Sequence, residues 1–396
     1  MKRILLTTTA LTMTAGIAAA EVSITGDFRL GFNDTDSNSK LVGTAEVAPV
    51  IAVSLAGVRT VTSVGTAASS DYVAAGTTDK KLGIYNDAGV TFALSSTMDN
   101  GMTAGVTLDM SGDDGAQAQD KYTFNLANDA TSVVFGSTEY SSRDNWTSAG
   151  DMATDNWANQ NSDDRNILKA TTNVGGLKIS ASTSVAAGVS TASSDPVSLT
   201  IGGSLGGASY VIVSEGSKMG IAATTAVGGA TLTTAYSTSE ASVTTNNVTV
   251  ESATLMNTST GIKIAYPMGA ITATASYVME SVATGADTTG GDSWNIAAVW
   301  TSGDTSVTFK TDEDSSNSVE GSTKLGAATV AAGMTDYLED MYLSVTNPLG
   351  GGASIMASYA IDGDDGVSAG SSKSSNDEIG GPDLQTGLTV ELKFAF

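Results

Sequence analysis

The sequence contains no cysteine and no histidine among its 396 residues. Without cysteine the chain has no disulfide framework, although an oxidising compartment is still compatible with it. Without histidine it has no Ser-His-Asp or Cys-His relay and no imidazole ligand for a metal. The residue inventory therefore excludes the common hydrolase mechanisms, and we predict that the protein is not an enzyme.

Basic residues are also scarce, because 18 lysines and arginines stand against 42 aspartates and glutamates. Such a surface repels nucleic acid, so no nucleic-acid partner is expected. No stretch after the first twenty residues approaches the ~18 consecutive apolar residues of a transmembrane helix. If the mature chain enters a membrane, it must do so as a closed β-barrel, in which every backbone polar group is paired.

The first twenty residues have the features of a signal peptide. Lys2 and Arg3 form a positive start, residues 4–15 form a short apolar core, and Ala18-Ala19-Ala20 forms an A-x-A cleavage site. We therefore assign 1–20 to a signal peptide and 21–396 to one exported domain.

The last ten residues alternate between apolar and polar side chains, as in a strand with one apolar face. The apolar face consists of Leu388, Val390, Leu392, Phe394 and Phe396. The pattern resembles the carboxy-terminal assembly signal of outer-membrane β-barrels, carried here by Gly387, Phe394 and Phe396. Residues 21–32 alternate in the same way. The first and last strands are therefore expected to pair and close a barrel, with Phe28 facing lipid and Arg29, Glu391 and Lys393 facing inward.

Between the two ends, short alternating segments recur at hairpin signals such as Asp99-Asn100-Gly101. Short glycine turns alternate with longer polar connections, such as 239–259, 281–292 and 362–383, which is typical of periplasmic turns and external loops. Counting every candidate gives up to twenty strands. Because some short segments could belong to loops, we expect an all-β transmembrane antiparallel barrel of 16 strands, with 18 as the alternative. Residues 34–80 are irregular and could hold an extra strand or a loop.

Several lysines fall out of phase with the apolar face of their predicted strands: Lys121, Lys178, Lys263 and Lys310. A lysine at the lipid midplane costs about 2–4 kcal/mol, so in a barrel these side chains should point into the water-filled interior. A two-layer sandwich with its cations facing solvent would show the same alternation.

The connection at 140–165, after the fifth predicted strand, differs from the other loops. It holds two of the four tryptophans, Trp146 and Trp157, and five aspartates. Before it lies Val133-Val134-Phe135-Gly136-Ser137. With the leader, the amphipathic first strand, the Asp-Asn-Gly hairpin and the terminal phenylalanine, this chain resembles the general diffusion porins of Gram-negative bacteria, especially those of alphaproteobacteria. Its low aromatic content, 6%, departs from that family's aromatic girdles.

The resemblance implies an outer-membrane homotrimer, inserted into lipid by the barrel assembly machinery, whose water-filled channels let small hydrophilic solutes and ions diffuse passively. It also implies that the third external loop, 140–165, folds into the pore. The implied constriction residues are Arg143, Asp144, Asp151, Asp155, Asp163, Asp164 and Arg165. The cations implied on the facing pore wall are Arg29, Lys81, Lys121 and Lys393.

Two further interpretations remain open. Residues 362–366, Asp-Gly-Asp-Asp-Gly, resemble part of a calcium loop, but Lys373 stands where an EF-hand has its bidentate glutamate. We therefore expect no cofactor beyond a loosely bound divalent cation such as calcium. The abundance of serine, threonine and glycine also fits a secreted or surface-layer, adhesin-like structural β protein, although such a protein needs no terminal phenylalanine.

Overall fold

The computed structural model describes residues 21–33, 51–53, 59–61, 83–113, 116–158, 166–185, 197–245, 248–283, 291–314, 316–335, 340–361, 379–382, 384 and 386–396. The expected signal peptide therefore lies outside the described residues, as do Lys81, Asp163, Asp164, Arg165 and the acidic stretch 362–366.

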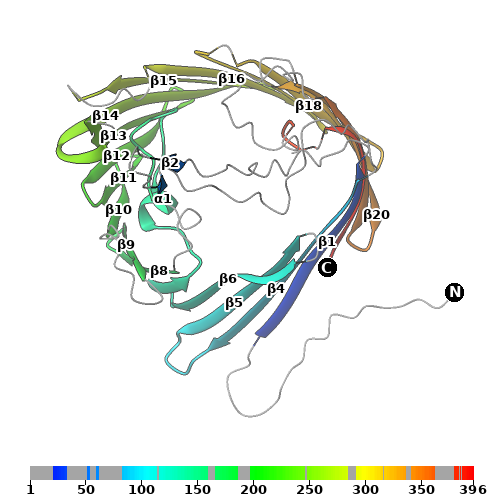
Figure 1. The fold of residues 1–396 in the computed structure, drawn as a ribbon, viewed down its shortest axis with the longest axis horizontal. Coiled ribbons are helices and arrows are strands. Elements are labelled where there is room, and N and C mark those ends of the chain that lie inside the picture. Colours follow the sequence, from blue (N-terminus) through cyan, green and yellow to red (C-terminus); the bar gives the residue numbers. More distant parts are fainter. Residues whose placement is uncertain are drawn as a thin grey trace.

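Twenty strands form one antiparallel sheet that closes on itself (Figure 1). Each strand pairs with the next along the chain, and β1 closes the ring by pairing with β22 on one edge and β4 on the other. The strands are β1 Glu21–Asn33, β4 Gly83–Thr97, β5 Thr103–Asp113, β6 Ala116–Ala127, β7 Thr131–Gly136, β8 Asn166–Val174, β9 Leu177–Val185, β10 Ser198–Leu205, β11 Ala208–Glu215, β12 Lys218–Val227, β13 Ala230–Thr245, β14 Val248–Met268, β15 Ile271–Ser281, β16 Ser293–Ser302, β17 Thr305–Asp312, β18 Ser318–Leu325, β19 Ala328–Thr335, β20 Asp340–Gly350, β21 Ala353–Ile361 and β22 Gly387–Ala395.

The expected number of 16 strands is wrong, and the count of every candidate segment, twenty, is right. Strands of eight residues, such as β18 and β19, pair with each other along nearly their whole length and belong to the wall. The polar stretch 239–259 is also largely strand, because β13 and β14 continue their pairing up to Thr245 and Val248. Polar side chains there do not prevent pairing, because the backbone supplies the hydrogen bonds.

The predicted pairing of the first and last strands is confirmed, and the structure gives its register. Phe28 pairs with Phe394, Arg29 with Lys393, and Gly31 with Glu391. The terminal residue extends this ladder, since Gly26 and Phe396 exchange backbone hydrogen bonds of 2.9 Å in both directions. The closing strand therefore pairs with β1 up to the last residue of the chain.

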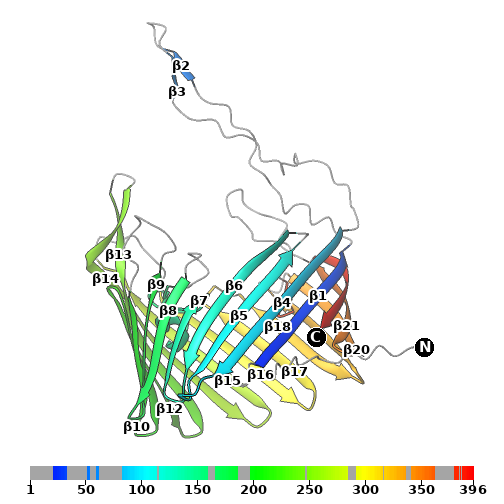
Figure 2. The same ribbon diagram turned by 90° about the horizontal axis from the view of Figure 1, so that it is seen from below.

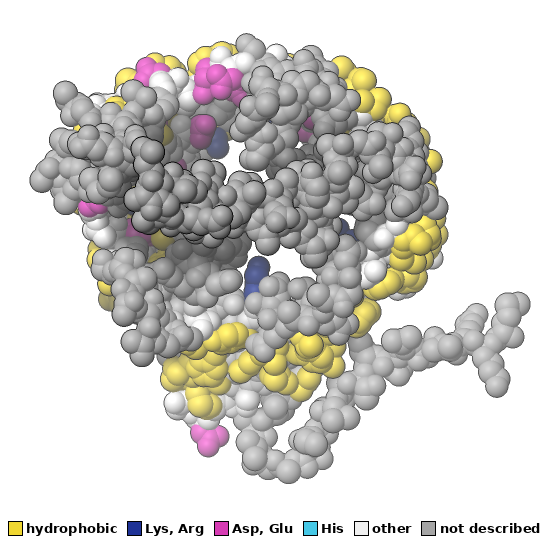
Figure 3. All heavy atoms as spheres, in the orientation of Figure 1, with side chains coloured by type: hydrophobic (Ala, Val, Ile, Leu, Met, Phe, Trp, Pro, Cys, Tyr) yellow, Lys and Arg dark blue, Asp and Glu magenta, His cyan; other side chains and the backbone are white. Residues whose placement is uncertain are grey.

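The two faces of the wall differ in composition. Exposed apolar side chains such as Ile221, Ile262 and Trp300 form the outer face, and Figure 3 shows hydrophobic side chains around the periphery with lysine and arginine side chains inside the ring. Lys263 lies between Thr233 and Ser276, which are both buried on the inner face, as its phase predicts. In the part of the chain that is described, no helix is both long and apolar enough to cross a membrane.

Two small elements complete the described structure. Strands β2 (Ile51–Val53) and β3 (Arg59–Val61) lie within the irregular stretch 34–80; they pair only with each other and lie away from the barrel (Figure 2). The helix α1 (Ser141–Asn145) lies inside the ring of strands (Figure 1). This helix belongs to the connection 140–165, which was expected to fold into the pore.

Candidate functional site: a segment folded into the barrel lumen

The chain turns inward at Gly136, the last residue of β7, three residues before the strand end predicted at Glu139. The φ angle of Gly136 is 119°, a conformation that side chains other than glycine rarely adopt. A Cβ at this position would lie 2.2 Å from the carbonyl oxygen of Tyr122. Glycine is therefore required where the chain leaves the wall, and the following residues, 137–158, form what we call the inner segment.

A row of three inward side chains holds both ends of the inner segment. Ser198 on β10 pairs with Ser182 on β9 and with Glu215 on β11, so the three lie side by side. The backbone N–H of Ser141 donates to Ser182 Oγ at 2.7 Å, and that of Ser142 donates to Ser198 Oγ at 2.8 Å. Glu215, which is 2% exposed, accepts hydrogen bonds from the Ser142 hydroxyl and, at 2.9 Å, from the N–H of residue 158. One carboxylate thus joins the start of the segment to its end.

A second row of the same composition holds the tip. Ser259 on β14 pairs with Ser237 on β13 and with Glu280 on β15. The Thr154 hydroxyl donates to Ser259 Oγ at 2.8 Å and lies 2.7 Å from Ser237 Oγ. Ser259 in turn donates to Glu280 at 2.6 Å, and the other oxygen of Glu280 accepts the N–H of Ala153 at 3.0 Å. Both rows are Ser-Ser-Glu, on β9–β11 and β13–β15.

Apolar packing fills the space between the two rows. Ala149, Met152 and Trp157 are buried against small apolar groups on the inner face of the wall, namely Val211, Val213, Ala222, Ala235 and Val278. Trp146 and Trp157 form a T-shaped pair with ring centroids 5.3 Å apart. A Cβ on Gly220 would lie 2.7 Å from the Trp146 ring, so glycine makes room for the pair. The wall and the segment are therefore complementary in shape as well as in hydrogen bonding.

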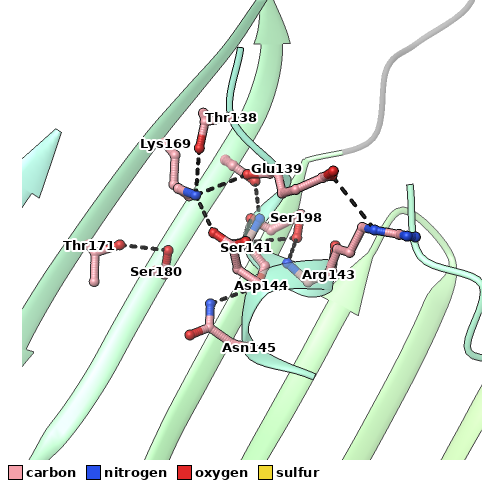
Figure 4. A network of polar contacts seen from close by, with 12 residues as sticks. Thr138, Glu139, Ser141, Arg143, Asp144, Asn145, Lys169, Thr171, Ser180 and Ser198 are labelled. Carbon is pink, nitrogen blue, oxygen red and sulfur yellow. Dashed lines mark hydrogen bonds and ion pairs between the residues drawn. The ribbon is translucent and has the colours of Figure 1, made fainter. Parts of the chain in front are cut away.

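The charged residues expected to constrict the pore differ in their contacts. Figure 4 shows those of Arg143 and Asp144. Lys169 on β8 pairs with Asp144 and also donates to the Thr138 hydroxyl at 2.8 Å. Arg143 lies 3.8 Å from the Glu139 carboxylate (Figure 4). Asp144 and Arg143 therefore project from the segment but are already paired.

The remaining described aspartates of the segment differ in burial. Asp155 accepts a 2.8 Å hydrogen bond from the indole N–H of Trp146, and its burial raises the pKa of its carboxyl group above the ordinary aspartate value. Asp151 is exposed, while its backbone oxygen accepts a 3.0 Å hydrogen bond from Ser293 on β16. Asp155 is thus partly structural, and Asp151 faces the lumen.

The strands opposite the segment carry two of the expected wall cations. Counting round the ring, nine strands separate β12 from β22 in either direction: β13 to β21 one way, and β1 with β4 to β11 the other. Lys393 on β22 and its neighbour Arg29 therefore stand opposite the segment. Arg29 lies 4.0 Å from both Asp27 and Asp87, so this wall mixes both signs of charge.

Lys121 lies closer to the segment round the ring than these two cations do. Its strand, β6, is separated from β8 by β7 alone, and it pairs in register with Asp109. The structure therefore places Arg29 and Lys393 side by side on the wall opposite the segment, whereas Lys121 lies on a different part of the wall.

A second inward element was not foreseen from the sequence. Residues 379–382 and 384, at the end of the connection read as an external loop at 362–383, are anchored on the inner face of β18–β21. Ile379 and Leu384 exchange backbone hydrogen bonds of 3.0 and 3.1 Å and are buried against Tyr342 and Ala360. The only signal was the pair of large apolar residues near the end of a polar stretch.

One protein family matches nearly the whole chain. Residues 7–366 match the family model described as Gram-negative porin. A search of curated proteins finds no match to this chain. Among solved structures, two engineered variants of the Rhodopseudomonas blastica porin are similar at 15% sequence identity, covering 95% of this chain and 100% of theirs, with TM-scores of 0.37 and 0.36.

Because these TM-scores are low, the assignment rests on the family model, which spans nearly the whole chain. The chain belongs to the Gram-negative porin family, and its closed barrel forms a channel through the outer membrane.

Proposed function

We propose that small hydrophilic solutes and ions diffuse passively through this barrel, and that the inner segment narrows their path. The observation that carries the proposal is the double attachment of the segment to the inner face, through Glu215 at its ends and Glu280 at its tip. A segment held at both places occupies the lumen permanently, so solutes must pass beside it. No chemical step is part of this function.

The charges beside that path support a filter for ions. Asp151 is exposed on the segment, and Arg29 and Lys393 stand on the wall opposite the segment. The narrow water column between low-dielectric walls concentrates the field of opposed charges. The carboxylates beside Arg29 weaken the positive side, and the whole chain is acidic. We therefore propose a modest preference for cations.

The assembly partners are proposed from the family and from the closing strand. We propose a homotrimer in outer-membrane lipid, inserted by the barrel assembly machinery, which would recognise the signal at Gly387, Phe394 and Phe396. Native mass spectrometry in detergent would test the trimer, and an exclusively monomeric channel would contradict it.

Planar-bilayer recording of the purified mature chain tests the channel itself. We expect stepwise conductance in potassium chloride, and its absence would contradict the proposal. Replacing residues 147–156 by a short Gly-Ser linker should raise the unit conductance, because it removes the tip of the segment from the lumen. If the conductance of this variant equals that of the wild type while its gel mobility remains heat-modifiable, the segment does not limit the path.

A further inference from the structure

We propose that the recess between β17–β20 and residues 379–384 is a binding subsite for small carboxylate solutes, with Lys310 as the residue that binds the carboxylate. The recess has a volume of about 400 Å³ and opens into the lumen. The inference rests on the proposed function, since it requires solutes to pass through the barrel.

Gly381 and Pro382 line one side of the recess, and the residues on either side of them, Ile379 and Leu384, are firmly anchored. Ile379 is 4% exposed and Leu384 is 1% exposed, and both pack on Tyr342. Gly380 has a φ angle of 74°, and a Cβ there would lie 2.2 Å from the Tyr342 ring. The element is therefore fitted against β20, and it closes the side of the recess formed by Gly381 and Pro382.

This anchoring also determines where the carboxylate of Glu320 points. One of its oxygens accepts hydrogen bonds from the Tyr342 hydroxyl at 2.8 Å and from the N–H of Gly381 at 2.7 Å. Lys310 pairs with Ser318, two residues before Glu320 on the same strand face, so the two charges are diagonal neighbours. Among the described residues Lys310 nevertheless forms no ion pair within 4.0 Å. The two hydrogen bonds hold Glu320 on the far side, and the Lys310 ammonium remains available to a solute.

The other groups around the recess complete the chemistry. Hydroxyl groups that can donate to a bound anion line it beside Lys310, and they belong to Ser306, Thr308 and Ser322. Ala331 and the Tyr342 ring supply apolar surface for a short carbon chain. An ammonium group with neighbouring hydroxyl donors binds a carboxylate through charge-assisted hydrogen bonds. The recess thus suits a small organic acid better than an uncharged sugar.

The place of the recess in the ring makes it part of the solute path. The inner segment ends its contacts at Ser293 on β16, and the recess begins on the adjacent strand, β17. The recess therefore lies beside the inner segment on the same wall, where a solute that passes the segment can reach Lys310. Binding there would slow the carboxylate within the channel and obstruct the flow of smaller ions.

Single-channel recording with succinate as the probe tests the proposal at constant ionic strength. We expect succinate to reduce the wild-type potassium chloride current in a saturable manner. Lys310→Gln should raise the half-blocking concentration about tenfold, because it removes a charged hydrogen-bond donor. Glu320→Gln should lower that concentration, since it removes the neighbouring negative charge while its amide oxygen can still accept the two hydrogen bonds.

Lys178→Gln on β9 is the matched control, because it removes an equal charge from another strand. It should leave the half-blocking concentration within about twofold of the wild type. An equal effect of both lysine variants would overturn the proposal, as would a wild-type channel that conducts normally without any saturable block. Absence of all conductance would instead contradict the proposed function, so the two failures can be told apart.

Discussion

Trp157→Ala should release the inner segment from the barrel wall. The Trp157 side chain is 3% exposed and forms a T-shaped contact with Trp146. Replacing a buried tryptophan by alanine costs about 3–5 kcal/mol in a protein core. Because water in the lumen can enter the space left behind, we take the lower end, about 3 kcal/mol. Since 1.4 kcal/mol corresponds to a factor of ten, the ratio of attached to detached segment should fall roughly 100-fold.

Single-channel recording at fixed voltage measures this change. The wild type should conduct in quiet steps, whereas Trp157→Ala should show open-channel noise and excursions to higher conductance as the segment detaches. The two Ser-Ser-Glu rows remain in the variant, so the barrel should still form and show heat-modifiable gel mobility. A folded variant with wild-type noise and conductance would refute the reasoning.

A disulfide between the segment and the wall provides the control. The chain has no cysteine, and a Cβ at Gly261 would lie 3.0 Å from the Ala149 Cβ. Disulfides need about 3.5–4.5 Å between Cβ atoms, and a Cβ at Gly261 would also lie 2.9 Å from the Ala149 carbonyl oxygen, so Ala149→Cys with Gly261→Cys requires the segment backbone to shift away from β14. Added to Trp157→Ala, this lock should restore quiet conduction, and a reductant should abolish the effect. If the locked channel stays noisy, segment detachment is not the source of the noise.

Three further perturbations have defined outcomes. Gly26→Val should lower the yield of heat-modifiable barrel, because a Cβ there would lie 2.6 Å from the Phe396 ring. Deleting Phe396 should have the same effect. If both variants assemble fully, the pairing of Gly26 with Phe396 is not needed for closure of the barrel. The raised pKa of Asp155 means that its charge opposes attachment of the segment above that pKa, and this cost disappears as the pH falls towards 3.8. Acidification should therefore reduce the open-channel noise of Trp157→Ala, but not that of the double variant Trp157→Ala with Asp155→Asn. Lys169→Met removes a cation and unpairs Asp144, so the reversal potential in a salt gradient should shift towards cation selectivity, and an unchanged potential would exclude this pair from the solute path.

The pairing of the first and last strands and the faces of their residues could be predicted because local and global constraints agree. Alternation fixes which residues of the first and last strands face outward, and closure requires these strands to pair. The strand number could not be fixed in the same way. A segment of eight alternating residues such as β18 has the same sequence pattern in a barrel wall as in a loop hairpin. Which of the two it forms depends on the strands that pair with it.

The inner segment could be foreseen only through the family resemblance. Nothing local indicates that Glu215 and Glu280 lie beside serines, because these rows depend on the register between neighbouring strands. Residues 379–384 were missed because glycine, proline and acidic residues dominate their surroundings, as in any external loop. The Trp146–Trp157 pair was visible as a concentration of aromatics, but its partner Gly220 was not.

The attachment of both inward elements by side chains has a consequence for how this channel can evolve. Barrel diameter grows with strand number, so a ring of twenty strands is wide, and under the proposed function its inserts exclude larger solutes. The inner segment and the second inward element are held by side chains on the inner face of the wall. Their attachment leaves the backbone hydrogen bonds between strands and the lipid-facing surface unchanged. Under the proposed function, substitutions at positions such as Asp151 or Lys310 therefore alter which solutes pass through the channel without altering the surfaces through which the barrel inserts into the membrane.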